Sequence, residues 1–155
     1  MIVDPNELSK PQEVESLYFA QPINIFKTEL KEKLLAAIRE RFPGVPIEDP
    51  DTKEHQEGYV RDGMAYYTGK VLRRGKRIVF LAFRDGMIGT GVFAEVRKVI
   101  ENGGVAAEIF PDASIRENVT LDPARMLSVE ETRARIRFPS EDPNDPSKKG
   151  PPRPY

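Results

Sequence analysis

Short apolar runs alternate with amphipathic segments along the first two thirds of the chain. The apolar runs are typical of buried strands, and the amphipathic segments are typical of helices because their apolar residues recur at helical spacing. The runs that predict strands are SLYFA (16–20), VPIED (45–49), RIVFLAF (77–83) and VAAEIF (105–110). The segments that predict helices are FKTELKEKLLAAIRERF (26–42), YVRDGMAYYTGKVL (59–72) and GVFAEVRKVIENGG (91–104). This alternation predicts an α/β fold with an open parallel sheet and helices on both faces.

Beyond the last of these strands the alternation fades, and the sequence predicts a short helix followed by a tail. In LSVEETRARIR (127–137), Ser128 precedes Glu131 by three residues, which is the spacing of a capping box. The final stretch, PSEDPNDPSKKGPPRPY, has six prolines in 17 residues and too few apolar residues to bury a core. We therefore expect a flexible lead-in at 1–15, one folded domain at 16–138, and a proline-rich tail at 139–155 that is disordered or packed on a partner subunit.

Composition narrows the classes of chemistry and partner. The chain has 155 residues, no cysteine and one histidine, which excludes disulfides, thiol catalysis and cysteine-based zinc sites; we expect neither a metal nor a cofactor. The formal net charge is −1, so no basic field indicates nucleic acid or an anionic membrane as a partner. No apolar run approaches the roughly 20 residues of a membrane helix, and the opening residues lack the apolar centre of a signal peptide. We expect a cytoplasmic protein.

The stretch FRDGMIGTGVFAEV (83–96) carries the candidate chemistry. It begins in the most strand-like run and combines three glycines with two carboxylates, Asp85 and Glu95. In open α/β sheets ligands bind beyond the carboxyl ends of the strands, where this loop should meet AQPIN (20–24). Glycines let the backbone approach a ligand closely, and a helix N-terminus favours an anion. The candidate substrate-binding residues are Ala20, Gln21, Pro22, Gly86, Gly89, Thr90 and Gly91.

Two interpretations of this stretch stay open. On a helical wheel of about 100° per residue, Glu95 lies about 40° outside the apolar stripe, so its side chain can point along the sheet edge into a crevice. The plainer interpretation is a tight turn followed by a glutamate that is simply favoured near a helix N-terminus. The pattern by itself favours the plainer interpretation.

Three segments, LYFAQPIN, FLAFRDG and GTGVFAEV, resemble the nucleoside 2-deoxyribosyltransferase-like superfamily, which includes deoxynucleoside-monophosphate N-glycosidases. The resemblance spans roughly residues 17–110. It implies a Rossmann-like α/β domain, a homo-oligomer for which we expect a dimer, and a glutamate nucleophile that follows a glycine-containing turn. By this resemblance Glu95 matches the nucleophile, Tyr18 matches the first-strand tyrosine that orients it, and Gly91 matches the family glycine.

Two positions depart from the family pattern. The family aspartate six positions before the nucleophile is Gly89 here, and the family threonine that follows the glycine is Val92. Thr90 stands in the place of the family serine and can hydrogen-bond a phosphate or a sugar hydroxyl. We expect Asp85 to supply the missing carboxylate and to act as the acid that assists the departing base.

The resulting hypothesis is an enzyme that cleaves the N-glycosidic bond of a nucleoside or nucleotide through the Glu95 carboxylate, as an N-glycosidase or a deoxyribosyltransferase. Tyr18 would position Glu95 and favour its ionised form by hydrogen bonding. The alternative is a non-catalytic nucleotide-binding or regulatory module of the same fold, which Gly89 favours. A third possibility is an unrelated α/β interaction domain, and convergence of Tyr18, Asp85 and Glu95 would count against it.

Overall fold

The computed structural model describes residues 16–51, 75–138 and 150–155. The predicted lead-in at 1–15, the predicted helix at 59–72 and most of the predicted tail lie outside the described residues. Within the described ranges, no helix is long and apolar enough to cross a membrane.

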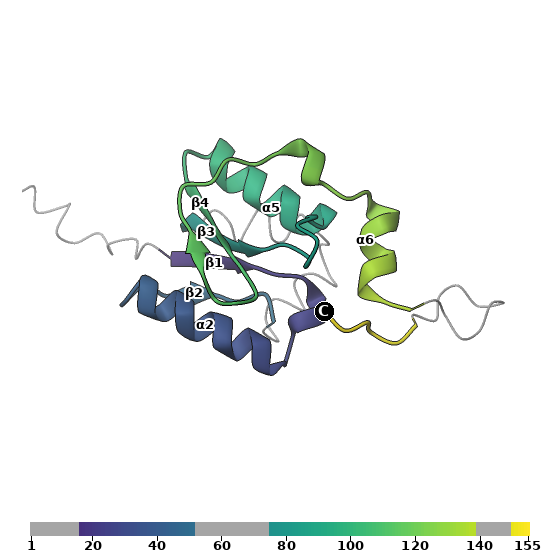
Figure 1. Cartoon of the computed structure of the whole chain (residues 1–155). Coiled ribbons are helices and arrows are strands. Elements are labelled where there is room, and N and C mark those ends of the chain that lie inside the picture. Colours follow the sequence, from purple (N-terminus) through teal and green to yellow (C-terminus); the bar gives the residue numbers. More distant parts are fainter. Residues whose placement is uncertain (1–15, 52–74, 139–149) are drawn as a thin grey trace, which may run out of the picture.

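A five-stranded mixed sheet forms the centre of the described chain, in the order β2-β1-β3-β4-β5 (Figure 1). The strands are β1 (Ser16–Ala20), β2 (Ile47–Glu48), β3 (Gly75–Leu81), β4 (Val105–Ile109) and β5 (Ile115–Arg116). The first four pair in parallel and coincide with the four predicted runs. The fold is therefore α/β, as the alternation predicts.

The expectation of an open parallel sheet holds for β1 to β4, but the sheet is mixed because β5 pairs antiparallel with β4. A tight turn reverses the chain between them: the Phe110 amide donates to the Ser114 carbonyl at 2.9 Å, and the Ser114 amide donates to Asp112 Oδ1 at 2.9 Å. β5 is short and lies after the last of the alternating apolar runs, where the sequence pattern fades, so the pattern did not indicate it.

Two helices cover opposite faces of the sheet (Figure 1). They are α2 (Glu29–Arg41), which lies within its predicted segment, and α5 (Thr90–Glu101), which begins one residue before its predicted segment. A third helix, α6 (Val129–Ile136), begins with the predicted capping box formed by Ser128 and Glu131. Two short 3-10 turns, η1 (Ile23–Ile25) and η3 (Pro123–Arg125), complete the described elements.

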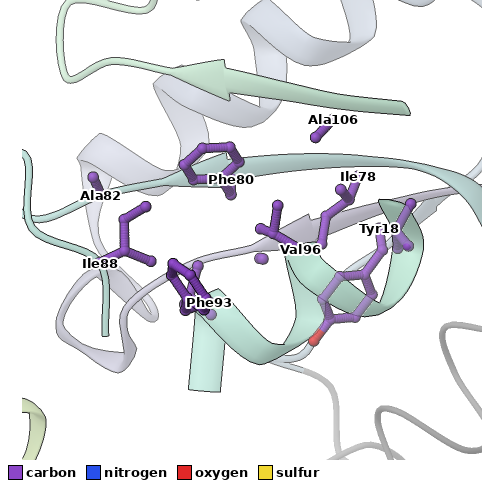
Figure 2. Close-up of a cluster of buried hydrophobic side chains, with 11 residues drawn as sticks. Tyr18, Ile78, Phe80, Ala82, Ile88, Phe93, Val96 and Ala106 are labelled. Carbon is purple, nitrogen blue, oxygen red and sulfur yellow. The ribbon is translucent and has the colours of Figure 1, made fainter. Parts of the chain in front are cut away.

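Alternation along β1 divides its side chains between two buried clusters. Leu17 and Phe19 lie in the cluster under α2, whereas Tyr18 and Ala20 lie in the cluster under α5. Figure 2 shows the second cluster, in which side chains of β1, β3 and β4 pack with those of α5. The period of two along the strand therefore places Tyr18 on the same face as α5.

The carboxyl edge, meaning the edge of the sheet where β1, β3 and β4 end, is covered by α6 and by residues 150–155 (Figure 1). The Phe138 amide donates to the Pro151 carbonyl at 2.9 Å, and the Arg153 amide donates to the Ile136 carbonyl at 2.8 Å. The expectation for the tail was disorder or a contact with a partner subunit, but residues 150–155 contact their own chain. Their order depends on backbone hydrogen bonds and on one anchoring ring, Tyr155, and neither produces a periodic pattern in the sequence.

Candidate functional site

Glu95 lies in the second turn of α5 and is almost completely buried, with 7% of its surface exposed. The Tyr18 hydroxyl, on a residue that is 2% exposed, hydrogen-bonds the Glu95 carboxyl. The other carboxyl oxygen, Oε2, is buried and has no hydrogen-bond partner among the described residues. The structure therefore brings together the predicted nucleophile and the tyrosine predicted to orient it.

Burial raises the pKa of Glu95 to about 8, and the hydrogen bond from Tyr18 acts in the opposite direction by lowering it. Burial dominates because removing a carboxylate from water disfavours its charged form. The side chain is thus protonated at neutral pH and ionised at mildly alkaline pH. A buried carboxyl with one unpartnered oxygen is costly to maintain, and such groups concentrate at functional sites.

Asp85 has a different partner from the one expected. Its carboxylate accepts two hydrogen bonds from the Arg135 guanidinium, at 2.8 and 2.7 Å, and a third from the Met87 amide at 3.1 Å. The hydrogen bonds from Arg135 lower the pKa of Asp85, whose side chain is 51% exposed. Within the described part of the chain Asp85 thus joins the loop after β3 to α6 and makes no contact with Glu95. A carboxylate held ionised in this way is a poor proton donor at neutral pH.

The N-terminus of α5 is also engaged by α6. The Thr90 amide donates to Thr132 Oγ1 at 3.0 Å, and Thr90 Oγ1 donates to the Leu127 carbonyl at 2.8 Å. Both polar groups that were expected to bind a phosphate or sugar hydroxyl are therefore occupied within the chain. Gly91, the next residue, is half-buried in the first turn.

Gly89 allows this close approach of α6. A Cβ atom at position 89 would lie 3.1 Å from Thr132 Cγ2 and 3.5 Å from Phe83 Cε2. Gly86 has another role: its φ of +86° favours glycine, and its carbonyl accepts from Arg125 Nε at 2.8 Å. The packing of α6 thus gives a steric reason for glycine where the resembled family has aspartate.

We expect Gly89→Ala to lower the free energy of unfolding by about 1 kcal/mol or more, because alanine is a poorer N-cap than glycine and its Cβ would crowd Thr132. Thr132→Ser removes the crowded methyl and keeps the hydroxyl. The double variant should recover about 0.5 kcal/mol relative to the sum of the single variants, measured by urea unfolding. If the changes in unfolding free energy of the two single variants simply add up to that of the double variant, the close contact does not contribute to stability.

The loop after β1 supplies one further buried polar group. Gln21 is 5% exposed, and its Nε2 donates to the Phe19 carbonyl at 3.3 Å and to Asp49 Oδ1 at 3.1 Å. Both amide hydrogens are thereby used, and Gln21 Oε1 has no hydrogen-bond partner among the described residues. Ala20 belongs to the core under α5, and Pro22 is the N-cap of η1. Of these three predicted binding residues, Gln21 presents an unused acceptor.

Sequence reasoning missed Lys31, which lies beside this loop. Its ammonium group is buried and forms ion pairs with Asp49 at 2.7 Å and Asp51 at 3.0 Å. The charged face of a helix normally faces water, so no sequence signal distinguishes this lysine from its neighbours. The cluster ties α2 to the chain after β2 and holds Asp49 against Gln21.

A groove lies on another surface of the molecule, away from Glu95. In the described ranges, no group of three or more acidic, histidine or cysteine side chains could hold a metal ion. A shallow groove of about 520 Å³ lies along α5 and the chain after β4; residues lining it include Phe93, Arg97, Ile100, Val105, Leu121 and Met126. At about 100° per residue, Glu95 points well over 100° away from the helix face that lines this groove. The groove is therefore separate from the Glu95 site.

Comparison of the chain with protein-family models, with curated proteins and with solved structures found no match in any of the three. The motif resemblance to the nucleoside 2-deoxyribosyltransferase-like superfamily therefore stays a prediction.

Proposed function

We propose that this chain cleaves the N-glycosidic bond of a nucleoside or nucleotide and uses Glu95 as its nucleophile, as an N-glycosidase or a pentosyltransferase. The observation that carries the proposal is the buried Glu95 carboxyl, which Tyr18 holds while Oε2 remains unpartnered among the described residues. The parallel strand order β2-β1-β3-β4 with helices on both faces also supports a Rossmann-like arrangement.

The chemistry needs an ionised Glu95. Its carboxylate oxygen attacks the anomeric carbon as the carbon–nitrogen bond breaks, and the bonding electron pair leaves with the base. The base takes up a proton from water, and the sugar remains as an ester on Glu95 until water or a second base displaces it. Tyr18 positions the carboxyl and lowers its pKa toward neutrality. We do not assign the protonation of the base to Asp85, because Arg135 keeps that carboxylate ionised.

A non-catalytic nucleotide-binding module is the second candidate, and one observation favours it. Glu95 is protonated at neutral pH in the described structure, and a protonated carboxyl is a poor nucleophile. Base release separates the two candidates, because a binding module releases none. The test is incubation with a panel of nucleosides and nucleoside monophosphates at pH 6 to 9, with free base measured by chromatography. Thermal shifts with the same panel detect binding without cleavage.

We expect kcat/KM for base release to rise about tenfold per pH unit below pH 8 and to level off above it, because only the ionised fraction of Glu95 is nucleophilic. Tyr18→Phe removes the hydrogen bond that lowers this pKa, so the profile should move to higher pH. The measurement is the pH dependence of initial rates for wild type and Tyr18→Phe. A profile that is flat between pH 6 and 8, or that the substitution leaves in place, would contradict a nucleophilic Glu95 with raised pKa.

A further inference from the structure

The last six residues of the sequence lie at the position where a doubly wound sheet normally binds its ligand. The connection after β1 leads to β2 and the connection after β3 leads to β4, so adjacent strands β1 and β3 diverge at a topological switch point. Asn24, in η1 after β1, donates from Nδ2 to the Arg153 carbonyl at 3.0 Å. The Tyr155 hydroxyl donates to the carbonyl of Ala82, which follows β3, at 2.5 Å. Residues 150–155 therefore bridge the two sides of the switch point.

Tyr155 is the anchor of this segment. Its ring packs against the buried cluster under α2 and lies 4.6 Å from the Arg84 guanidinium. Arg84 Nε also donates to the Tyr155 carbonyl oxygen at 3.3 Å. Burial raises the pKa of Tyr155 to about 12, which keeps its hydroxyl protonated and able to donate to Ala82. Ala82 and Arg84 thus hold the side chain of Tyr155, and Arg84 also holds its backbone.

Residues 151–154 lie on the surface like a bound peptide and are not part of the core. Residues 151–154 are exposed, and hydrogen bonds hold them at the edge of α6 and η1. Arg153 Nη1 donates to the Ala134 carbonyl at 2.8 Å, and its guanidinium lies 5.0 Å from the Phe138 ring. One aromatic anchor with a few hydrogen bonds is the usual composition of a weak peptide-recognition surface. Residues 151–154 can therefore leave without opening either buried cluster, whereas the Tyr155 ring must give up its contact with the cluster under α2.

We propose that the carboxyl edge is a binding surface for the extended segment Gly-Pro-Pro-Arg-Pro-Tyr. Residues 150–155 occupy this surface within the chain, and they compete there with a nucleoside or nucleotide that binds at the same edge. Binding of the segment stands independently of the proposed function. The competition rests on the proposed function, since the competing ligand is a nucleoside or nucleotide. Displacement of the segment frees Ala82, Arg84 and Asn24 at the switch point.

The first experiment uses the chain truncated after residue 149, with folding checked by circular dichroism and thermal melting. We titrate it with the synthetic hexapeptide and follow backbone amide shifts of Ala82 and Arg84 by NMR. Saturable 1:1 binding is expected, and a hexapeptide ending in phenylalanine should bind about three- to tenfold more weakly because it lacks the hydroxyl hydrogen bond. The full chain should not respond, since its surface is occupied. No saturable shift, or equal binding of both peptides, would overturn the proposal.

The second experiment tests competition. Nucleosides and nucleoside monophosphates should bind the truncated chain more tightly than the full chain, and the hexapeptide should displace them. Equal affinity for both chains would refute competition. If no nucleoside binds either chain, the proposed function fails, and the peptide titration still decides whether the segment has a specific binding surface.

A third measurement covers the case in which the truncated chain does not fold. In full-length Tyr155→Phe, the amides of Phe138 and Arg153 should exchange hydrogen about three- to tenfold faster than in wild type, because the anchor that holds their partners is weakened. The Gly104 amide, which bonds the Val99 carbonyl at the far end of α5, is the internal control and should not change. Unchanged exchange at Phe138 and Arg153 would overturn the anchoring role of Tyr155.

Discussion

Glu95→Gln is expected to lower base release by on the order of a thousandfold or more, because an amide oxygen cannot form the ester with the sugar. Glutamine matches glutamate in shape and can still accept the hydrogen bond from Tyr18, so the variant should fold. The neutral glutamine side chain also resembles the protonated carboxyl that Glu95 has at neutral pH. Initial rates with the best substrate of the panel give the comparison, at pH 9 where the wild-type carboxyl is largely ionised.

Glu101→Gln is the matched control for this comparison. Glu101 lies on the same helix, is exposed, and within the described ranges forms one ion pair, a long i,i+4 contact of 4.0 Å with Arg97. Its substitution changes net charge by the same amount and should leave base release within about twofold of wild type. If both variants lose base release to a similar extent, the cause is a general effect on α5. If Glu95→Gln remains active, Glu95 is not the nucleophile.

The second large effect is on stability, and it does not depend on substrate. The pKa of Glu95 is about 8 in the folded chain against a model value of 4.5, so between these pH values the folded state binds one more proton than the unfolded state. The free energy of unfolding should therefore fall as pH rises from 4.5 to 8, by about 1 kcal/mol per pH unit. Below pH 4.5 the contribution is fully present, and above pH 8 it is lost.

Glu95→Gln isolates this contribution because glutamine does not titrate. The measurement is the free energy of urea unfolding of the variant minus that of wild type, at pH 5 and at pH 8.5. This difference should be roughly 3–5 kcal/mol more favourable to the variant at pH 8.5 than at pH 5. Glu101→Gln should follow the wild-type pH dependence, since Glu101 is exposed. A pH-independent difference between wild type and Glu95→Gln would show that Glu95 is not held protonated by burial.

The sequence predicted the elements whose side chains follow a period. Apolar alternation and helical spacing located β1, β3, α2 and α5, and the Ser128–Glu131 spacing located the start of α6. The helical wheel also placed Glu95 at the border of the apolar stripe, and in the structure that border is buried against β1. These features are local or periodic, so one sequence is enough to predict them.

The features that the sequence could not predict are contacts between distant segments. The ion pair of Asp85 with Arg135 joins residues 50 positions apart, and it replaces the expected acid. The bond from the Thr90 amide to Thr132 spans 42 positions and fills the expected anion site. Tyr155 reaches Ala82 across 73 positions. No local propensity encodes such pairings, because each depends on how α6 and the final residues pack on the carboxyl edge.

These contacts also bear on how a ligand enters. With α6 and residues 150–155 across the carboxyl edge, a ligand can cross that edge only after the final segment moves. If the ligand enters there, added hexapeptide should inhibit base release by the chain truncated after residue 149. The expected dimer is a further prediction, and its test is the solution mass of the full chain.

The most direct measurement is peptide mapping by mass spectrometry of wild-type protein quenched in acid during turnover of a cleaved nucleoside. We expect the sugar to be attached to the peptide that contains Glu95, and to be missing from the same peptide of Glu95→Gln. Released base without sugar on Glu95 at any quench time would contradict the account, and so would sugar attached to another residue.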